Sequence, residues 1–535
     1  MRLLPAAIVA VALTVRLWGI DFGLPLVYAR PDELLVIGKV VGFFKGDPNP
    51  HFFDYPSLYL YAIAGVYAIF YGVGRLAGWF TSAPAFVGSF RHHYAPFFLI
   101  PRVMSAVLGA ATSAIVHATA APLFGTAAGL LSALFMALAF LHVRDSHYAT
   151  TDVAATFFIA CAVLAIVRVY RERRASDATL AGVLAGIATG VKYNAVVLAV
   201  PMVVVELLHA WTLRGDARRV VRETHLLRMA VPFILVFIAG SPYLFLDYQT
   251  ALRDLGALRD STASGMTPPE LLGRGWTYHL PYSLRYGLGW PMLASALAGI
   301  VMMALRRPAA AAILGSFPVV YYVLAGGGYN VFVRYMIPVV PFLCIFAGYF
   351  VAELASIASG RLRMPFAVSA TVLGLAVAAP SAVSVVRFDR LLATEDSRNV
   401  AAQWVVENVP VGSTIYMSGN RYGHPELEVG QEKPRYRHLG FDYRKESFTE
   451  NRRLTDARPD VIIVQRSELP YSHIPPPVET LLATEYSLIH TVRAAADNTG
   501  NFYDVQDGFY LPFGGFNRVT RPGPNLLIYR RKEKG

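Results

Sequence analysis

Apolar runs long enough to cross a lipid bilayer recur along most of this chain. A helix needs about 20 apolar residues to span ~30 Å of hydrocarbon. Runs of about that length lie at residues 3–20, 97–121, 127–148, 152–170, 228–246, 288–305, 309–326, 332–352 and 364–387. With 55% hydrophobic and only 16% charged residues over 535 positions, the chain is too apolar for an ordinary soluble domain. The sequence therefore predicts a multispanning membrane protein.

The net charge of +12 does not indicate a nucleic-acid partner. Much of the excess lies in short Arg-rich loops between apolar runs, such as 171–174, where positive charge sets membrane orientation. The sequence contains no recognisable nucleic-acid-binding motif. Cys161 and Cys344 are the only cysteines. Both lie inside apolar runs and outside any ligand spacing, so they predict neither a disulfide nor a metal site.

A further apolar run, residues 178–211, is too long for a single span. It is interrupted at residues 190–194, and basic loops flank it on both sides. Because the positive-inside rule places both loops in the cytoplasm, the run must turn back on itself. We predict two short helices, with Lys192 at the outer surface between them.

The segment 56–79 is apolar but rich in tyrosine. Keeping the Arg-rich loops inside requires an even number of crossings between Asp32 and Asp152. Three candidate segments lie between these two acids, so one of the three does not cross. Aromatic residues favour the headgroup boundary, and we therefore predict an interfacial helix at 56–79 in the first outer loop. About eleven spans remain, with the N-terminus inside. Arg16 and the lack of a small-residue cleavage site argue against a signal peptide.

The chain changes character towards its C-terminal end. Charged residues, Pro and Gly become frequent, and short apolar runs such as 414–417 and 461–464 are bounded by turn residues, as in strands. Residues 399–408 have the periodicity of an amphipathic helix. We predict an all-α polytopic membrane domain over 1–387 and a small extracytoplasmic α/β domain over 388–535. The second domain has no P-loop, GxGxxG or zinc-ligand spacing, which favours support or acceptor binding over catalysis.

Two adjacent carboxylates, Asp32 and Glu33, follow the first apolar segment. Ionisable groups at a membrane cost free energy unless they are paired or used. The pair is therefore a candidate reactive or ligand-binding site, and a solvated turn is the alternative.

Asp152 begins a predicted span, where a carboxylate can simply cap a helix N-terminus. The predicted topology nevertheless places it on the same outer face as Asp32. Acids that face one another beside a membrane can deprotonate a nucleophile or hold a divalent metal. Further candidates for such a metal site are His51, Asp54 and His279, although a lone loop histidine is more often solvated.

Two cations are predicted at the same outer face. Lys192 lies between two apolar helices, where it either snorkels to the headgroups or binds a lipid phosphate as a point charge. Arg334 lies at the outer end of a span, against the positive-inside trend. That position favours a specific anion, again a phosphate.

Four segments in order resemble the membrane-embedded GT-C glycosyltransferases. They are Asp32 and Glu33 after Arg-Pro, then 53–59, then 148–152, and then 186–192. Within GT-C the chain is similar to the group of protein O-mannosyltransferases and lipid A aminoarabinose transferases. The resemblance covers roughly residues 1–350. The tail at 507–513 and 521–524 also resembles the extracytoplasmic ends of bacterial proteins in this group, which implies a bacterial inner-membrane protein.

The resemblance implies roles for individual residues. Asp32, with Glu33 beside it, is the expected catalytic acid of the first outer loop, and Asp152 is the acid of the second. Lys192 would meet the phosphate of a polyprenyl-phosphate sugar donor, with Arg334 as a second candidate. The chain departs from the aminoarabinose transferase pattern at 54–56, where Asp-Tyr-Pro replaces the more usual Glu-Lys-Pro. A metal contact there is left open.

The predicted function is transfer of a sugar, with inversion, from a polyprenyl phosphate to an extracytoplasmic lipid, glycan or protein. The predicted partners are that donor, membrane lipids and the acceptor, and a divalent metal is an open possibility. A transporter or lipid flippase is the alternative, but it favours internal repeats and charges near the midplane. A scaffold that presents the C-terminal domain would leave the outer acids unexplained.

Overall fold

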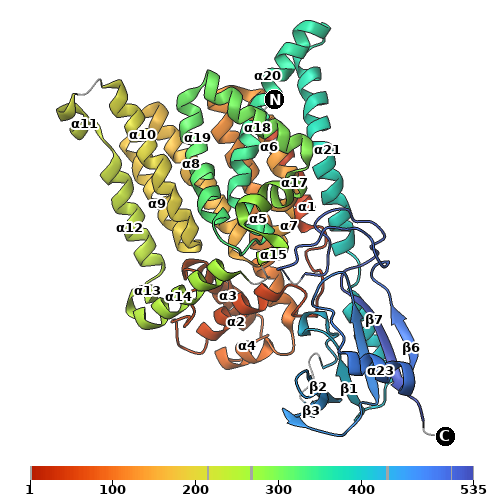
Figure 1. The fold of residues 1–535 in the computed structure, drawn as a ribbon. Coiled ribbons are helices and arrows are strands. Elements are labelled where there is room, and N and C mark those ends of the chain that lie inside the picture. Colours follow the sequence, from red (N-terminus) through yellow and green to blue (C-terminus); the bar gives the residue numbers. More distant parts are fainter. Residues whose placement is uncertain (1–2, 214–215, 266–268, 429–432, 508, 534–535) are drawn as a thin grey trace. The chain divides into compact units, whose positions relative to one another are not determined.

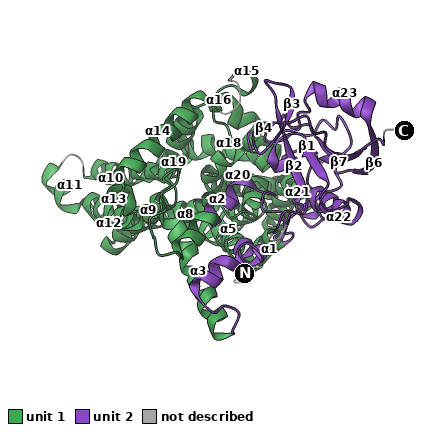
Figure 2. Ribbon diagram, turned by 90° about the horizontal axis from the view of Figure 1, so that it is seen from below, with its two compact units in different colours: residues 1–17, 38–77, 100–386 green, residues 18–37, 78–99, 387–535 purple. Residues whose placement is uncertain are grey.

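The computed structural model describes residues 3–213, 216–265, 269–428, 433–507 and 509–533. Gly508, within the tail motif noted above, therefore lies outside the described residues. The chain forms two compact units (Figure 2). Unit 1 comprises residues 1–17, 38–77 and 100–386, and unit 2 comprises 18–37, 78–99 and 387–535. Unit 2 thus joins two segments near the N-terminus to the C-terminal residues.

Unit 1 is a bundle of helices (Figure 1). A helix corresponds to each of the eleven predicted spans. These helices are α1 (Leu4–Leu17), α5 (Tyr94–Phe124), α6 (Thr126–Leu138), α8 (Thr151–Glu172), α9 (Ala175–Val191), α10 (Ala199–Thr212), α12 (Leu226–Gly240), α18 (Trp290–Arg306), α19 (Pro308–Gly326), α20 (Val340–Leu362) and α21 (Phe366–Leu392). The first residues of α5 and the last of α21 belong to unit 2.

Further helical elements connect these helices. They are α2 (Pro31–Phe43), α3 (Leu58–Leu76), α4 (Ala83–Ser89), α7 (Phe140–Asp145), η1 (Tyr193–Leu198), α11 (Ala217–Glu223), α13 (Tyr243–Leu246), α14 (Tyr248–Ser264), α15 (Pro269–Leu272), α16 (Gly275–Tyr278), η2 (His279–Leu284), α17 (Arg285–Leu288) and η3 (Val333–Val339). The predicted break at Lys192 is confirmed, because α9 ends at Val191 and η1 begins at Tyr193. Lys192 itself has extended backbone, with φ −152°.

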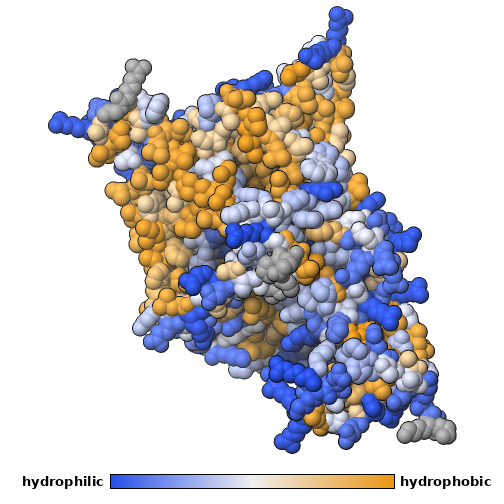
Figure 3. Space-filling model, viewed as in Figure 1, coloured by the Kyte–Doolittle hydropathy of each residue, from blue (hydrophilic) through white to orange (hydrophobic). Residues whose placement is uncertain are grey.

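The outward faces of the bundle are apolar. Figure 3 shows hydrophobic side chains over much of this surface. Exposed examples are Leu207, Leu235, Val301 and Val319. In a water-soluble protein such a surface would be a liability, whereas lipid tails match it. By length and composition, eight helices of the described chain can cross a membrane, or nine if the bent α16–α18 region is one span. The predicted count of eleven stays a prediction.

Small residues allow the bundle helices to approach one another closely. Gly182 of α9 faces the backbone oxygen of Met229 in α12, and Gly299 of α18 faces that of Phe346 in α20. A Cβ atom at either glycine would collide with the neighbouring backbone. Close backbone contact at small residues is the packing mode expected of helices in lipid, where hydrophobic exclusion does not drive association.

Helix α3 corresponds to the predicted interfacial segment. It lies at the lower end of the bundle in Figure 1. At its N-terminus, Leu58 packs against Gly190 near the end of α9 and Gly240 at the end of α12. Its length and composition also qualify it as a candidate span. Whether α3 crosses the membrane or lies along it therefore stays a prediction.

Unit 2 contains a seven-stranded sheet in the order β4-β3-β2-β1-β5-β7-β6. Its strands are β1 (Thr414–Met417), β2 (Arg437–Asp442), β3 (Ser447–Glu450), β4 (Arg453–Leu454), β5 (Val461–Arg466), β6 (Tyr486–Val492) and β7 (Asn525–Arg531). The central strand β1 pairs in parallel with β2 on one side and β5 on the other, while the remaining pairs are antiparallel. The strands predicted at 414–417 and 461–464 are both confirmed.

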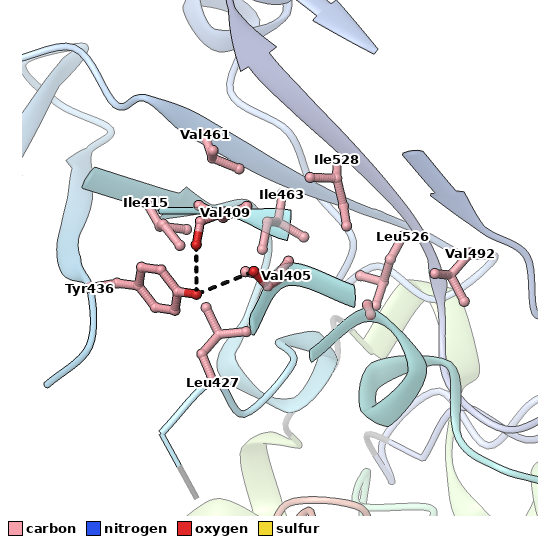
Figure 4. Packing of buried hydrophobic residues seen from close by; sticks show 11 residues of the cluster. Val405, Val409, Ile415, Leu427, Tyr436, Val461, Ile463, Val492, Leu526 and Ile528 are labelled. Carbon is pink, nitrogen blue, oxygen red and sulfur yellow. Dashed lines mark hydrogen bonds between the residues drawn. The ribbon is translucent and has the colours of Figure 1, made fainter. Parts of the chain in front are cut away.

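Helices pack on both faces of this sheet. Helix α22 (Ser397–Asn408) places Val405 against Ile415, Val461 and Ile463 on one face (Figure 4). Helix α23 (Pro476–Glu485) contributes Val478 and Leu482 to the core on the other face, and η4 (Arg421–Gly423) follows β1. Alternate residues of β5 contribute to the two cores, because neighbouring residues of a strand point to opposite faces of the sheet. An all-α membrane domain with a small C-terminal α/β part is confirmed as the fold class.

Candidate active site

The centre of the candidate site in unit 1 is an ion pair between Asp152 and Lys192. The Lys192 Nζ lies 2.5 Å from Asp152 Oδ1, and the two side chains are 12% and 4% exposed. Asp152 stands in the first turn of α8, and Lys192 stands at the break between α9 and η1. The structure thus brings together an acid and a cation that the sequence placed only on the same face. The pairing also gives both charges a partner in a poorly solvated position.

Aromatic and amide side chains surround this pair. The Lys192 Nζ lies 5.6 Å from the ring centroid of Tyr335 in η3. Asn194, two residues after the lysine, donates a hydrogen bond of 2.7 Å to the hydroxyl of Tyr321 in α19. Arg334 precedes Tyr335, is buried, and packs its guanidinium 4.2 Å from the centroid of Phe332. The second predicted phosphate ligand therefore belongs to the same short element that contacts Lys192.

Several buried polar atoms next to the pair in sequence have no hydrogen-bond partner in the described chain. They are the hydroxyls of Thr150, Thr151 and Thr189 and the side-chain oxygen of Asn194. Buried polar groups in native proteins are usually satisfied, and exceptions call for an explanation such as a ligand or water. Hydroxyl donors beside a lysine suit a phosphate or sugar ligand.

Hydrogen bonds attach the loop that carries Asp54 to the same region. The Tyr193 hydroxyl donates to the carbonyl of Phe53 at 3.1 Å, and the Phe53 N–H donates to Asp254 Oδ2 at 3.1 Å. Burial, together with the neighbouring Asp254 carboxylate, raises the pKa of Asp54, while Lys39 opposes the shift. Asp54 therefore lies near a second acid, as a cation ligand would.

The other two metal candidates have partners of their own. His51 is exposed, and its ring nitrogens lie 2.9 Å from Asp47 Oδ2 and 3.3 Å from Asp247 Oδ2. His279 is fully buried, and its Nδ1 lies 2.9 Å from the Ser283 hydroxyl. Among the described residues, no three His, Cys, Asp or Glu side chains gather in a way that could hold a metal ion.

Asp32 and Glu33 belong to unit 2, at the start of α2. An acid in the first turn of a helix is favoured by the helix dipole. Asp32 is partly exposed and Glu33 is fully buried, with the Glu33 N–H donating to the Arg30 carbonyl at 3.2 Å. Of the two acids, only Asp32 therefore has a side chain that is accessible to a substrate.

The sequence did not reveal the partner of Arg30. Its Nη1 lies 2.6 Å from Asp507 Oδ1, and both side chains are 1% exposed. The two residues are 477 positions apart in the chain. The only available signal was an arginine two residues before the acid pair, and it does not identify the partner.

The role of Arg16 was also missed. Its position inside an apolar run is unusual, and the side chain is fully buried. Its guanidinium donates to the carbonyls of Met136 and Ala137 at 3.3 and 3.0 Å, and to the Ser146 hydroxyl at 3.1 Å. The last carbonyls of a helix lack intrahelical donors. Arg16 supplies donors at the end of α6 and thereby supports the polar segment that leads to Asp152.

Unit 2 also has a small cavity of about 180 Å³ at the carboxyl end of β1. Its polar lining residues are Tyr28, Arg421, His424, Glu426, Glu428 and His438. The Arg421 guanidinium lies 4.1 Å from the ring centroid of Tyr28, four residues before Asp32. Burial lowers the pKa of His424 to about 4, so its imidazole is neutral at pH 7. Open α/β sheets bind ligands at the carboxyl ends of their parallel strands, and this cavity lies at that end of β1.

Comparison with known proteins supports the sequence resemblance. The family described as "Dolichyl-phosphate-mannose-protein mannosyltransferase" matches residues 99–243, which is less than half of the chain. No curated protein sequence matches the chain significantly. The matched region contains Asp152 and Lys192 but excludes Asp32.

Two solved structures share the fold over most of the chain. ArnT from Cupriavidus metallidurans, solved with undecaprenyl phosphate, aligns with a TM-score of 0.52 at 15% identity, covering 98% of this chain and 97% of that one. The oligosaccharyltransferase AglB from Archaeoglobus fulgidus, solved with an inhibitory peptide and a dolichol-phosphate, aligns with a TM-score of 0.53 at 11% identity. That alignment covers 80% of this chain and 63% of AglB, so the chain spans less than two thirds of AglB. At these identities the likeness establishes the fold.

Proposed function

Since the chain has the fold of the GT-C glycosyltransferases, we propose that it transfers a sugar from a polyprenyl phosphate to an extracytoplasmic acceptor. The main support is the buried ion pair between Asp152 and Lys192. Beside it lie threonine hydroxyls that have no hydrogen-bond partner in the described chain. A lipid-linked donor suits a cationic site next to apolar helices. ArnT and AglB, which share the fold, were solved with undecaprenyl phosphate and dolichol-phosphate respectively.

In the proposed reaction, Asp32 removes the proton from the acceptor hydroxyl as that oxygen attacks the anomeric carbon. The bond from this carbon to the phosphate oxygen breaks, and the configuration inverts. Lys192 and Arg334 stabilise the negative charge that grows on the departing phosphate. Because Lys192 already pairs with Asp152, the donor phosphate must share or displace that carboxylate.

The acceptor is proposed to contact the cavity at the end of β1. The two carboxylates of Glu426 and Glu428 outnumber the guanidinium of Arg421 in its lining. His424 adds no positive charge, because it is neutral at pH 7. That balance disfavours a phosphate and favours the hydroxyl groups of a sugar. Its position near Tyr28 connects it with the loop that carries Asp32.

Arg421→Ala is expected to raise the acceptor KM roughly fivefold, as the loss of a cation–π and hydrogen-bonding side chain would. Donor affinity should not change. Steady-state kinetics with varied acceptor would measure the effect. Arg444→Ala, at an exposed position of the same unit, is the control. An unchanged KM for Arg421→Ala would exclude this cavity from acceptor binding.

The proposed topology places unit 2 outside a bacterial inner membrane and the loop between α8 and α9 inside. In a variant without Cys161 and Cys344, a single cysteine at exposed Ser487 should react with a membrane-impermeant maleimide in intact spheroplasts. One at exposed Ser176 should react only after lysis. The opposite labelling pattern would contradict the topology, and with it the outer location of the site.

A further inference from the structure

The first outer loop is attached to the C-terminal part of unit 2 by a buried charge pair. Besides the 2.6 Å ion pair with Asp507, the Arg30 Nη1 donates to the Asp507 carbonyl at 3.2 Å. Arg30 immediately precedes α2, whose second residue is Asp32. A charge this deeply buried is tolerated only with a well-placed partner. The burial of Arg30 therefore depends on Asp507.

Further contacts attach the same loop along its length. The ring of Phe509 packs edge-on against Phe22, with centroids 6.0 Å apart, and lies 5.8 Å from the Arg30 guanidinium. The Asn399 amide of α22 donates to the carbonyls of Gly23 and Leu24, both at 3.1 Å. Residues 22–30 are thus held at both ends by residues of the C-terminal part.

The ion pair is connected to the acids by the backbone. The Glu33 N–H bonds to the Arg30 carbonyl, which closes the turn that starts α2. The Glu33 side chain is fully buried. With this turn fixed, the direction in which Asp32 leaves the helix is fixed as well. Small displacements of a catalytic group can cost large factors in rate.

We propose that Asp507 is a positioning residue that holds Arg30, and through it the start of α2, so that Asp32 faces its substrate. This inference rests on the proposed function, because it takes Asp32 as the base. It gives the C-terminal domain a role in catalysis that does not require it to touch the donor.

The test compares two ion pairs of unit 2 in the full-length protein in nanodiscs. Asp507→Asn keeps the shape and removes the charge. Asp460→Asn does the same to the Asp460–Arg531 pair, whose atoms lie 3.2 Å apart and which joins the start of β5 to the end of β7. Each variant is measured for turnover, for affinity towards polyprenyl phosphate, and for hydrogen exchange of residues 22–36.

Asp507→Asn is expected to lower turnover roughly tenfold and to speed exchange across residues 22–36, with unchanged affinity for polyprenyl phosphate. Asp460→Asn should leave turnover and that exchange close to wild type. Asp507→Glu, which keeps the charge, should recover part of the turnover. Phe509→Leu should show a smaller effect in the same direction, and it covers the case in which Asp507→Asn does not fold.

Unchanged exchange of the loop in Asp507→Asn would overturn the proposal, as would equal losses of turnover in Asp507→Asn and Asp460→Asn. The exchange measurement needs no substrate. If the exchange changes as expected but Asp32→Asn is as active as wild type, Asp32 is not the base and the catalytic role of Asp507 fails. If wild-type protein transfers no sugar from polyprenyl phosphate, the proposed function fails. In both cases the ordering of the loop by Asp507 stands.

Discussion

Asp32→Asn is expected to lower turnover by about 10² to 10⁴-fold, the usual loss when a general base is removed. Asparagine has nearly the same shape but cannot accept the proton. Asp32 is the partly exposed member of the acid pair at the start of α2, and the proposed donor ligands belong to other elements. Affinity for polyprenyl phosphate should therefore stay within about twofold of wild type.

The measurement is release of polyprenyl phosphate from a radiolabelled donor by purified protein in nanodiscs. Asp21→Asn is the matched control, because Asp21 is an exposed acid of the same segment, 18–37. It should retain turnover. Near-normal turnover in Asp32→Asn would remove Asp32 from the mechanism. Glu33→Gln, at a fully buried position, should affect stability more than rate.

Lys192→Ala and Asp152→Asn are expected to change donor affinity in opposite directions. Loss of the lysine should weaken binding of polyprenyl phosphate by about 10 to 100-fold, as for a lost hydrogen bond to a charged group. Loss of the carboxylate releases the lysine from its 2.5 Å ion pair. The donor phosphate then no longer competes with Asp152 for the lysine, so it binds more tightly. The readout is the dissociation constant from titration in nanodiscs.

The opposite signs separate ligand binding from a structural role. Both single variants leave one buried charge without its partner, which costs about 3–5 kcal/mol of stability in fully buried pairs. Both should therefore lower the thermal midpoint, and the double variant should recover part of the loss. If both variants weaken binding equally, or neither changes it, the pair is structural and Lys192 is not the phosphate ligand.

The local elements of this fold could be predicted because their signals are local. The strand at 414–417 and helix α22 follow from a hydrophobic period or from turn residues within a few positions. The break at Lys192 follows from the length of its apolar run and the basic loops that flank it. The membrane class follows from the length of the apolar runs for the same reason.

The partners of the candidate site residues could not be predicted, because they depend on how distant segments meet. Lys192 and Asp152 are 40 residues apart, and nothing near either residue specifies the other. The same holds for Tyr335 beneath the lysine. The sequence also gave no reason to group residues 18–37 with the C-terminal residues, since a short loop between apolar runs carries no mark of its neighbours.

The separation of Arg30 from Asp507 along the chain also determines when their ion pair can form during synthesis. A ribosome that adds roughly 5–20 residues per second needs about half a minute to a minute and a half to travel from one to the other. Throughout that interval the nascent chain carries an arginine whose counter-charge does not yet exist. The loop with Asp32 is among the first segments to leave the ribosome, yet its native contacts are among the last to form. The acid therefore acquires its final orientation only when synthesis has passed residue 507.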